Sequence, residues 1–358
     1  MEEKNKNFIK IYSDSIVYVA APANLATGGP ELLHQLAYHL RNNLKIDAYM
    51  YYFNANDTYP VHPEYKCYHN PFVKEIKDDE KNILILPEVF TECKIFNNCL
   101  KIRKCLWWLS IDNFYINILL NVKTNFFLSR TVNKLFKVLF RRSLIDINKK
   151  VMFKAKKFDL LHYIDSNWLH LVQSVYAFNH LLTKNIPKDK IFYLSDYLNE
   201  DFLKTQTDLA QKQNIIVYNP QKGFAFTDRI LKKAKDIKFI PIINMTREEV
   251  IKTLQRAKVY IDFGNHPGKD RIPREAAILG CCVITGKRGS AAFYDDVPIP
   301  EEYKFEDKKE NIPAIIAKIK DCLENYDERY NDFNNYRDVI KQEPKKFLDD
   351  LNKIFVRI

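Results

Sequence analysis

Short apolar runs alternate with amphipathic segments along most of this sequence, and the alternation predicts parallel strands covered by helices. In the first half, residues 15–22 (SIVYVAAP) predict a strand and residues 30–42 predict a helix, in which Pro30 suits the first turn. Further strands are predicted at 45–53, 82–90, 105–113, 159–166 and 190–197. This first series has the pattern of a doubly wound domain.

A second series of the same kind begins after residue 200. Strands are predicted at 214–220, 238–243, 257–264, 281–286 and 302–305, and helices near 224–236, 246–256, 272–279 and 312–325. We therefore predict an α/β fold in which two Rossmann-like domains face each other across a cleft. The predicted domains are residues 1–197 and 198–335, and the last helical stretch, 336–358, is predicted to pack back on the N-terminal domain.

The stretch 114–157 interrupts this alternation, because aromatic and aliphatic residues there are interleaved with Lys and Arg and almost no acidic residue. At helical spacing, an apolar stripe that includes Phe136 and Phe140 separates from basic residues such as Lys134 and Arg141. Such a helix can lie on an anionic membrane surface. An equally simple interpretation is a helix that packs on the sheet and exposes a solvated basic face.

Composition excludes several classes of protein. With 358 residues, of which 46 % are hydrophobic, the chain is long enough for two folded domains. Its seven cysteines form no C-x-x-C pair, and the charged start MEEKNKNF lacks the apolar core of a signal peptide. No stretch reaches the roughly 18 uninterrupted apolar residues of a membrane span. We expect a cytoplasmic protein with reduced thiols, and the basic stretch allows peripheral attachment to the inner face of the cell membrane.

The formal net charge of +11 favours an anionic partner, such as a nucleotide phosphate or an anionic membrane surface. A bias toward lysine codons explains the charge equally well. Nucleic acid is disfavoured as a partner, because no helix-turn-helix, zinc-finger or RNP motif accompanies the basic residues.

Glycine is scarce, with eight residues in the chain, and it is clustered. Gly28 and Gly29 stand together after the first predicted strand, and the other six fall between 223 and 289. Ligands bind beyond the carboxyl ends of strands in open parallel sheets, which makes the loops after the strands the candidate sites.

The loop that follows the strand at 257–264 is the richest in candidate chemistry. A helix is predicted to begin near Pro273, and the backbone amides at its start favour a diphosphate. Lys269, Arg271 and Arg274 add positive charge there. Glu275, in the first turn, either compensates the helix dipole or accepts ribose hydroxyls beside a bound phosphate.

The run from Met245 to Thr285 resembles the donor-nucleotide half of glycosyltransferases with the GT-B fold, in particular those of glycosyltransferase family 4. In REAAILGCCVIT, Glu275 is followed by Ala276, and Gly280 precedes the next strand. The resemblance implies that Glu275 holds the ribose of a nucleotide sugar.

Two other loops carry the same resemblance. In YNPQKG, which contains Asn219, Lys222 matches the family's phosphate-binding lysine. In NLATGGPE, Gly28 and Gly29 match the glycine-rich loop where the sugar or the acceptor approaches the backbone. These residues are therefore implied to bind the donor or the acceptor.

Two positions depart from the family's pattern. Pro267 stands where the family has a glutamate eight positions before Glu275, and Val217 stands where an arginine precedes the loop lysine by five positions. The missing positive charge can come from Arg271 or Arg274. The loop expected to contact the donor is completed by residues that can bind the sugar or the phosphates, namely His266, Gly268, Lys269 and Asp270.

The resemblance implies a transferase that moves a glycosyl group from a nucleotide sugar to a hydroxyl of a glycan or lipid-linked saccharide, as in bacterial surface polysaccharide synthesis. Enzymes of this fold stabilise the leaving diphosphate with cationic side chains and a helix start. We therefore expect no metal and no cofactor, and no metal-ligand cluster is evident among the eight histidines.

Other functions remain open on the same fold. A non-catalytic nucleotide- or glycan-binding module and a sugar-nucleotide epimerase are the alternatives. A nicotinamide-dependent dehydrogenase is disfavoured, because no G-x-G-x-x-G follows a strand.

An acceptor-side base, where the reaction uses one, must come from the first domain. Glu88, Asp112 and Asp165 are the candidates, each near the end of a predicted strand. Each can instead be a helix cap or a hydrogen-bonded loop residue, which is the commoner role. Asp112 is preferred, because WWLSIDN resembles sequences of bacterial glycosyltransferase-like proteins. A retaining enzyme needs no base.

Overall fold

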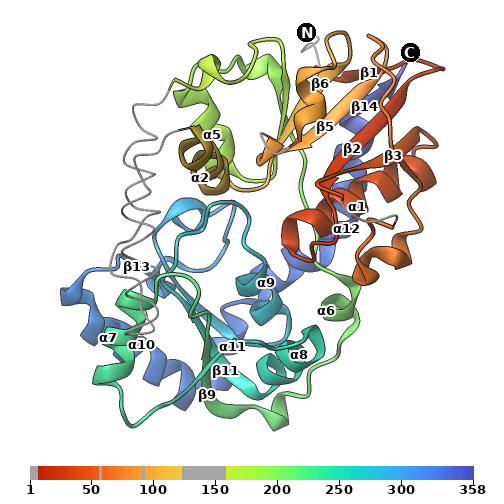
Figure 1. The fold of residues 1–358 in the computed structure, drawn as a ribbon. Coiled ribbons are helices and arrows are strands. Elements are labelled where there is room, and N and C mark those ends of the chain that lie inside the picture. The colour runs from red at the N-terminus through yellow and green to blue at the C-terminus, as the bar shows by residue number, and fades with distance from the viewer. Residues whose placement is uncertain (1–6, 56–58, 91–92, 123–158) are drawn as a thin grey trace, which may run out of the picture. The chain divides into compact units, whose positions relative to one another are not determined.

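The computed structural model describes residues 7–55, 59–90, 93–122 and 159–358. The chain divides into two compact units (Figure 1). Unit 1 takes the described residues up to Gln173, together with Ala177–Leu194 and Leu348–Ile358, and unit 2 takes Ser174–Tyr176 and Ser195–Phe347. Each unit contains a parallel sheet, as the pattern of apolar runs predicts.

Unit 1 is built on a seven-stranded sheet in the order β4-β3-β2-β5-β6-β7-β8, in which all neighbours are parallel. Its strands are β2 (Ile16–Pro22), β3 (Asp47–Phe53), β4 (Phe72–Val73), β5 (Ile83–Pro87), β6 (Arg103–Trp108), β7 (Leu169–Val172) and β8 (Ile191–Tyr193). Helices α1 (Gly28–Asn42), α2 (Ile111–Val122) and α5 (Val175–Thr183) follow β2, β6 and β7 along the chain. All five residues of β5 are buried, which explains its continuous apolar sequence.

The strand predicted at 105–113 ends earlier than the sequence suggests. Strand β6 stops at Trp108, and α2 begins at Ile111. The Ser110 Oγ accepts a hydrogen bond from the Asn113 amide at 3.1 Å. A serine that bonds to the third amide of a following helix acts as its N-cap, so Ser110 ends the extended run.

The prediction of a strand at 159–166 is wrong. Residues Leu160–His162 form a 3₁₀ turn, and the strand of this region is β7, which starts at Leu169. The carboxylates of Asp159 and Asp165 accept hydrogen bonds from the amides two residues later, at 3.1 and 2.8 Å. Such local bonds compete with an extended backbone.

The two ends of the chain contribute a feature that the sequence pattern does not predict. Strand β1 (Ile9–Ile11) pairs in parallel with β14 (Phe355–Arg357). Helix α12 (Asn334–Ile354) leads into β14 and has Pro344 inside it. Because Leu348–Ile358 cluster with unit 1, the last residues belong to the same unit as the first.

Unit 2 has a five-stranded sheet in the order β10-β9-β11-β12-β13, again parallel throughout. Its strands are β9 (Gln213–Tyr218), β10 (Lys238–Pro241), β11 (Ala257–Asp262), β12 (Cys282–Gly286) and β13 (Lys304–Phe305). Its helices are α6 (Glu200–Lys204), α7 (Phe224–Lys233), α8 (Arg247–Arg256), α9 (Arg271–Ile278), α10 (Ile312–Glu324), α11 (Tyr326–Asn331) and most of α12. Each predicted element of the second series is therefore present, with ends that differ by no more than about three residues from the prediction.

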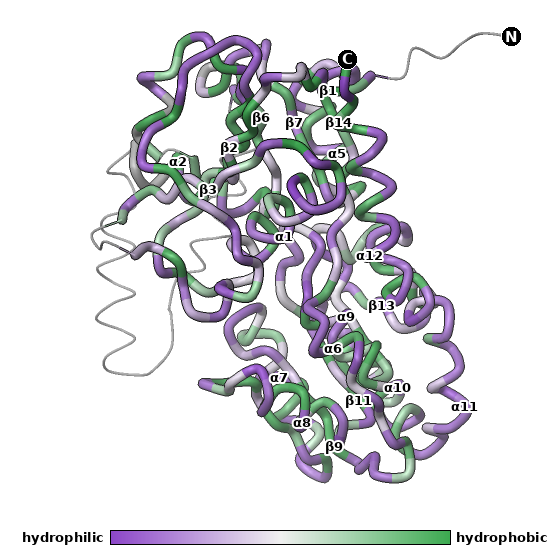
Figure 2. Tube along the Cα trace, turned by 90° about the vertical axis from the view of Figure 1, so that its right-hand side faces the viewer, coloured by the Kyte–Doolittle hydropathy of each residue, from purple (hydrophilic) through white to green (hydrophobic). Residues whose placement is uncertain are grey.

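The core of unit 2 explains why this series is amphipathic. Hydrophobic and hydrophilic residues alternate along α7 and α8 in Figure 2. Ile230 of α7 and Leu254 of α8 are fully buried in one cluster with Val217, Ile261 and Ile284 of the sheet. Each helix thus buries one apolar face on the sheet and leaves its polar face to solvent.

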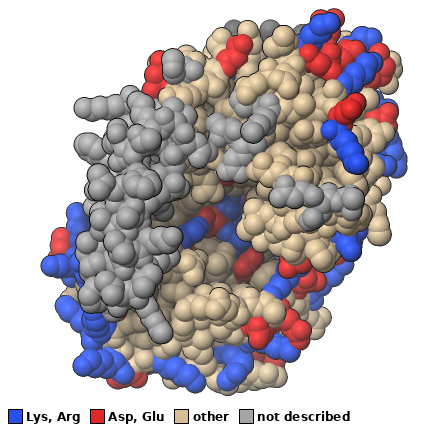
Figure 3. All heavy atoms as spheres, viewed as in Figure 1, with Lys and Arg blue, Asp and Glu red and all other residues tan. Residues whose placement is uncertain are grey.

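Most of the basic stretch 114–157 lies outside the described residues, and the prediction of a membrane-binding helix there stays a prediction. No helix among the described residues is both long and apolar enough to cross a membrane. On the face shown in Figure 3, Lys and Arg side chains of the described residues are interspersed with Asp and Glu side chains.

Candidate functional site

The loops after β9 and β11 meet at the carboxyl edge of the unit 2 sheet. Strand β9 has β10 on one side and β11 on the other, so the order of the strands reverses at β9. Ligands of open α/β sheets bind at such a reversal. Lys222 lies in the loop after β9, and its Nζ is 2.8 Å from Oδ2 of Asp270, the N-cap position of α9. The structure therefore brings the predicted phosphate lysine to the start of the predicted phosphate-binding helix.

Two glycines allow close backbone contacts here, one between the loops after β9 and β11 and one between the loops after β11 and β12. Gly223, beside Lys222, has a φ of +61°, and a Cβ there would lie 2.6 Å from the Gly264 amide and closer still to the Phe263 carbonyl. Gly289 has a φ of +60° and faces the carbonyl of His266, which also accepts a hydrogen bond from the Ser290 amide at 2.9 Å. Glycine alone has both the space and the left-handed backbone that these contacts need.

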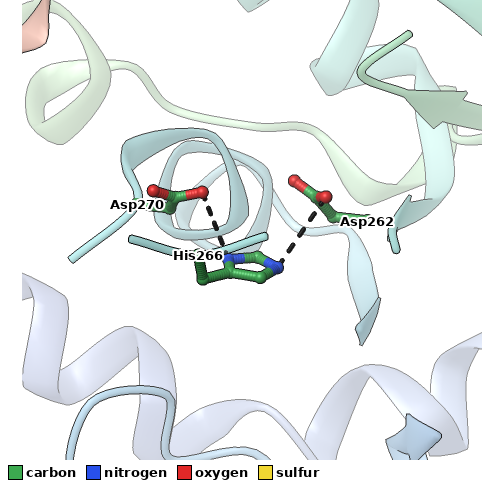
Figure 4. A group of neighbouring side chains, drawn as sticks. All are labelled: Asp262, His266 and Asp270. Atoms are coloured by element: carbon green, nitrogen blue, oxygen red, sulfur yellow. Dashed lines mark ion pairs between the residues drawn. The ribbon is translucent and has the colours of Figure 1, made fainter. Parts of the chain in front are cut away.

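A chain of alternating charges runs from the interior of unit 2 to Lys222. Figure 4 shows three of its members, Asp262, His266 and Asp270. The imidazole of His266 lies between two carboxylates: its Nε2 is 3.7 Å from Asp262 Oδ1 and its Nδ1 is 3.2 Å from Asp270 Oδ2. Asp262 also accepts hydrogen bonds from the Tyr260 hydroxyl at 2.9 Å and the Gly264 amide at 2.8 Å. The side chain of His266 is fully buried, whereas that of Lys222 is 38 % exposed. The chain of charges therefore reaches the surface at the lysine.

The charges in this chain support one another. Burial disfavours the charged form of His266, but Asp262 and Asp270 outweigh burial and raise its pKa. Burial of Asp270 acts against its ionisation, but Lys222 and His266 lower its pKa to about 2. Within the described residues neither ring nitrogen of His266 makes a well-aligned hydrogen bond, so its contacts with the carboxylates are mainly electrostatic.

Asp262, His266 and Asp270 are also a group that could hold a metal ion, with ligand atoms within 4.8 Å of one another. The two ring nitrogens, however, face different carboxylates in Figure 4. The ammonium of Lys222 already lies on Asp270, and the two carboxylates raise the pKa of His266, which favours a positive charge on the ring between them. The arrangement is that of a charge chain that positions Lys222.

The charge chain predicts a pH dependence of stability. A histidine whose pKa is raised by folding contributes stability below about pH 6.5, its ordinary pKa, and loses it as the pH rises through the folded-state value. We expect the loss in free energy of unfolding caused by His266→Gln, measured by urea denaturation, to be larger at pH 6 than at pH 9. His39, whose pKa is lowered by burial, is the control, and His39→Gln is expected to show the opposite trend. Equal losses at both pH values for His266→Gln would contradict the ion pairs.

Arg274 lies in a second buried network. Its guanidinium donates two hydrogen bonds to Asp196, at 3.0 and 2.5 Å, and one to Glu343 of α12 at 2.9 Å. Lys269 Nζ contacts the same two carboxylates, at 3.2 Å from Asp196 and 2.7 Å from Glu343. The remaining guanidinium contacts are backbone carbonyls, those of Lys269 and Asp270. The network fixes the start of α9 to the segment that enters unit 2 and to α12.

The other residues expected to bind the donor lie around the start of α9. Arg271 is the first residue of α9 and is half-buried, and Glu275 is buried one turn later. The Gly268 carbonyl accepts a hydrogen bond from the Ser290 hydroxyl at 2.6 Å. Asn219 Oδ1 accepts one from the Gln221 amide at 2.9 Å, which shapes the loop before Lys222.

The strand order of the unit 1 sheet also reverses, between β2 and β5. Strands β3 and β4 follow on one side of this point, and β6, β7 and β8 follow on the other. Gly28 and Gly29 begin α1 after β2, and Glu88 follows β5 directly. Asp112 lies in the first turn of α2 after β6 and is buried. These four residues therefore share the carboxyl edge of the sheet.

Asp165 is placed differently. It is exposed and precedes β7, so it lies at the amino end of that strand rather than at the carboxyl end that the sequence predicts. In a parallel sheet the amino ends form the edge opposite to the one where ligands bind. Asp165 is thus separated from Glu88 and Asp112.

Sequence reasoning missed three carboxylates of these networks. The spacing of four residues in Asp262, His266 and Asp270 was a signal that could have revealed the charge chain. Asp196 and Glu343 had none, because they lie 78 and 69 residues from Arg274 in the sequence. Only the fold brings them to the start of α9.

Known structures share this fold. HepE of Anabaena, in a complex with UDP-glucose, matches over 94 % of this chain and 98 % of its own, with 11 % identity and a TM-score of 0.59. Sucrose-phosphate synthase of Thermosynechococcus elongatus matches over 94 % and 96 %, with 12 % identity and a TM-score of 0.59. The lipopolysaccharide outer core galactosyltransferase WaaB, in its apo form, matches over 94 % and 99 %, with 10 % identity and a TM-score of 0.52.

These likenesses show that the chain has the α/β GT-B fold of glycosyltransferases, as predicted. No protein-family model matches the sequence, and no curated protein matches it. The resemblance to glycosyltransferase family 4 therefore stays a prediction.

Proposed function

We propose that this protein is a glycosyltransferase that moves a sugar from a nucleotide-sugar donor to a hydroxyl of a glycan or lipid-linked saccharide, in the synthesis of a bacterial surface polysaccharide. The observation that carries the proposal is the convergence of Lys222 and the start of α9 at the reversal of the unit 2 sheet. HepE, which shares this fold, has been seen in a complex with UDP-glucose.

The chemistry of this edge suits a diphosphate. Lys222 offers a half-exposed ammonium, Arg271 stands at the first position of α9, and the amides at the helix start favour negative charge. The leaving nucleoside diphosphate gains negative charge as the sugar–phosphate bond breaks, and fixed positive groups lower the energy of that state. The proposed mechanism therefore needs no divalent cation.

Arg274 has a different part in this proposal from the one that the sequence suggests. Its guanidinium is bonded to Asp196, Glu343 and two carbonyls in the interior. We assign phosphate binding to Lys222 and Arg271, and the positioning of α9 to Arg274. Glu275 remains the residue proposed to hold the ribose.

Replacing Lys222 tests the donor site. Lys222→Met is expected to raise the Kd for UDP, or for the nucleoside diphosphate that binds best, by roughly 10- to 100-fold, because a hydrogen bond to a charged group contributes about 1.5–3 kcal/mol. Isothermal titration calorimetry measures the change. Lys232→Met is the control. Lys232 lies in the last turn of α7, the helix that follows the loop of Lys222; its side chain is 61 % exposed and pairs with Asp228.

The two variants remove the same charge, so general electrostatic attraction should affect both alike. The proposal requires a large loss for Lys222→Met and little change for Lys232→Met. Equal affinities in the two variants would contradict the assignment. Binding without any release of diphosphate from a sugar nucleotide would instead favour a non-catalytic binding module.

A further inference from the structure

Glu88 is a buried carboxylate, and one of its two oxygens has no hydrogen-bond partner among the described residues. It follows β5 at the carboxyl edge of the unit 1 sheet and is only 5 % exposed. Its Oε1 accepts a long hydrogen bond, 3.4 Å, from Asn113 Nδ2, and its Oε2 makes no hydrogen bond with any residue that the structure describes. A buried polar atom without a partner is costly, and such atoms often belong to functional sites. Glu88 Oε2 is thus available to accept a hydrogen bond from a bound ligand.

The surroundings of Glu88 narrow the kind of ligand. Leu109 adjoins both Glu88 and Gly29. Its backbone amide acts to lower the pKa of the Glu88 carboxyl, and its Cδ1 would lie 3.5 Å from a Cβ at Gly29. Gly29 stands in the first turn of α1, whose N-cap residue Thr27 makes no side-chain capping bond. The edge thus offers a carboxylate oxygen together with backbone amides at a helix start. A neutral hydroxyl, which both donates and accepts hydrogen bonds, matches that combination.

The protonation of Glu88 fits a role in proton transfer. Burial raises the pKa of its carboxyl to about 7, and the amides of Glu88, Asn113 and Leu109 offset only part of the effect. No charged side chain of the described residues is among the causes of this shift. A general base works best when its pKa is near the working pH.

We propose that Glu88 binds the nucleophilic hydroxyl of the acceptor and takes its proton, which makes it a catalytic residue and identifies the acceptor as a neutral sugar or polyol hydroxyl. This inference rests on the proposed glycosyl transfer. The hydroxyl oxygen forms the new bond to the anomeric carbon, while the bond from that carbon to the phosphate oxygen breaks. Its electron pair leaves with the nucleoside diphosphate, the hydroxyl proton goes to Glu88 Oε2, and Glu88 later gives that proton to solvent.

Glu88→Gln tests this inference, because glutamine keeps the shape and the acceptor for Asn113 but cannot take a proton. The readout is release of UDP from UDP-glucose and a panel of other UDP-sugars, with water or 4-nitrophenyl glycosides as the acceptor. We expect Glu88→Gln to lower the rate by roughly 10²- to 10⁴-fold. UDP affinity, measured separately by calorimetry, should stay within about twofold of the wild type. The wild-type rate should rise with pH through about 7, and Glu88→Asp should retain such a rise.

Asp112→Asn is the matched comparison, since Asp112 is another buried acidic side chain expected at this edge. An unchanged rate in Glu88→Gln, or a loss in Asp112→Asn alone, would overturn the inference and leave the donor site intact. UDP binding without UDP release from any sugar in the wild type would also overturn it. A wild type that neither binds UDP nor releases it would overturn the proposed function itself.

Discussion

Replacing Arg274 with alanine is expected to lower the free energy of unfolding of unit 2 by about 3–5 kcal/mol. The reason is that two buried carboxylates lose their hydrogen bonds to the guanidinium. Asp196 and Glu343 are 0 % and 2 % exposed, and the guanidinium supplies three of their hydrogen bonds. Lys269 remains beside both, but one ammonium then faces two buried negative charges. Urea denaturation followed by circular dichroism measures the change.

A comparison of two further variants separates this effect from a loss of packing. Lys232→Ala removes an exposed cation that pairs with Asp228 on α7, and it is expected to leave the unfolding midpoint nearly unchanged, because exposed ion pairs contribute little. Combining Arg274→Ala with Asp196→Asn should recover part of the stability, since one buried charge is removed. A small loss for Arg274→Ala, with no recovery in the double variant, would contradict the buried network.

Gly223→Ala is expected to lower the free energy of unfolding by about 3 kcal/mol. The left-handed backbone of Gly223 costs an alanine about 1–2 kcal/mol, and overpacking adds about 1–3 kcal/mol. The added methyl group would overlap the backbone of Phe263 and Gly264, which cannot move away as a flexible side chain would. Since Lys222 precedes Gly223, we expect nucleoside diphosphate binding to weaken as well.

Gly286→Ala is a control for this prediction in the same sheet. A Cβ at Gly286 would lie 3.5 Å from Phe263, which is an ordinary contact, and no left-handed backbone is needed there. We expect its unfolding midpoint to stay close to that of the wild type. Similar midpoints for Gly223→Ala and the wild type would mean that the loops after β9 and β11 are further apart than the structure shows.

The fold was predictable because the spacing of apolar residues along this chain shows which segments form buried strands and which form amphipathic helices. Buried parallel strands such as β5 and β12 require continuous apolar runs, and amphipathic helices such as α7 require one apolar face. The prediction failed where short polar contacts decide the backbone. Asp165 and Ser110 bond to nearby amides, which ends or prevents a strand in an apolar stretch.

The candidate site was predictable only in part, for a similar reason. The placement of Lys222, Asp270 and Glu275 near the carboxyl edge of the unit 2 sheet follows from the order of strands and helices. The sequence does not show which cationic side chains are already paired with carboxylates, because the partners of Arg274 come from distant segments. The sequence placed both Glu88 and Asp165 near the carboxyl ends of strands. The fold shows that Glu88 follows β5, whereas Asp165 precedes β7.

The central claim is that the reversal between β9 and β11 binds a nucleoside diphosphate. Isothermal titration of the wild-type protein with UDP, GDP, ADP and their sugar conjugates tests it most directly, because it needs no knowledge of the acceptor. The structure predicts saturable binding of at least one of them at one site per chain, weakened by Lys222→Met. No binding by any of these nucleotides, or equal binding by Lys222→Met, would contradict the claim.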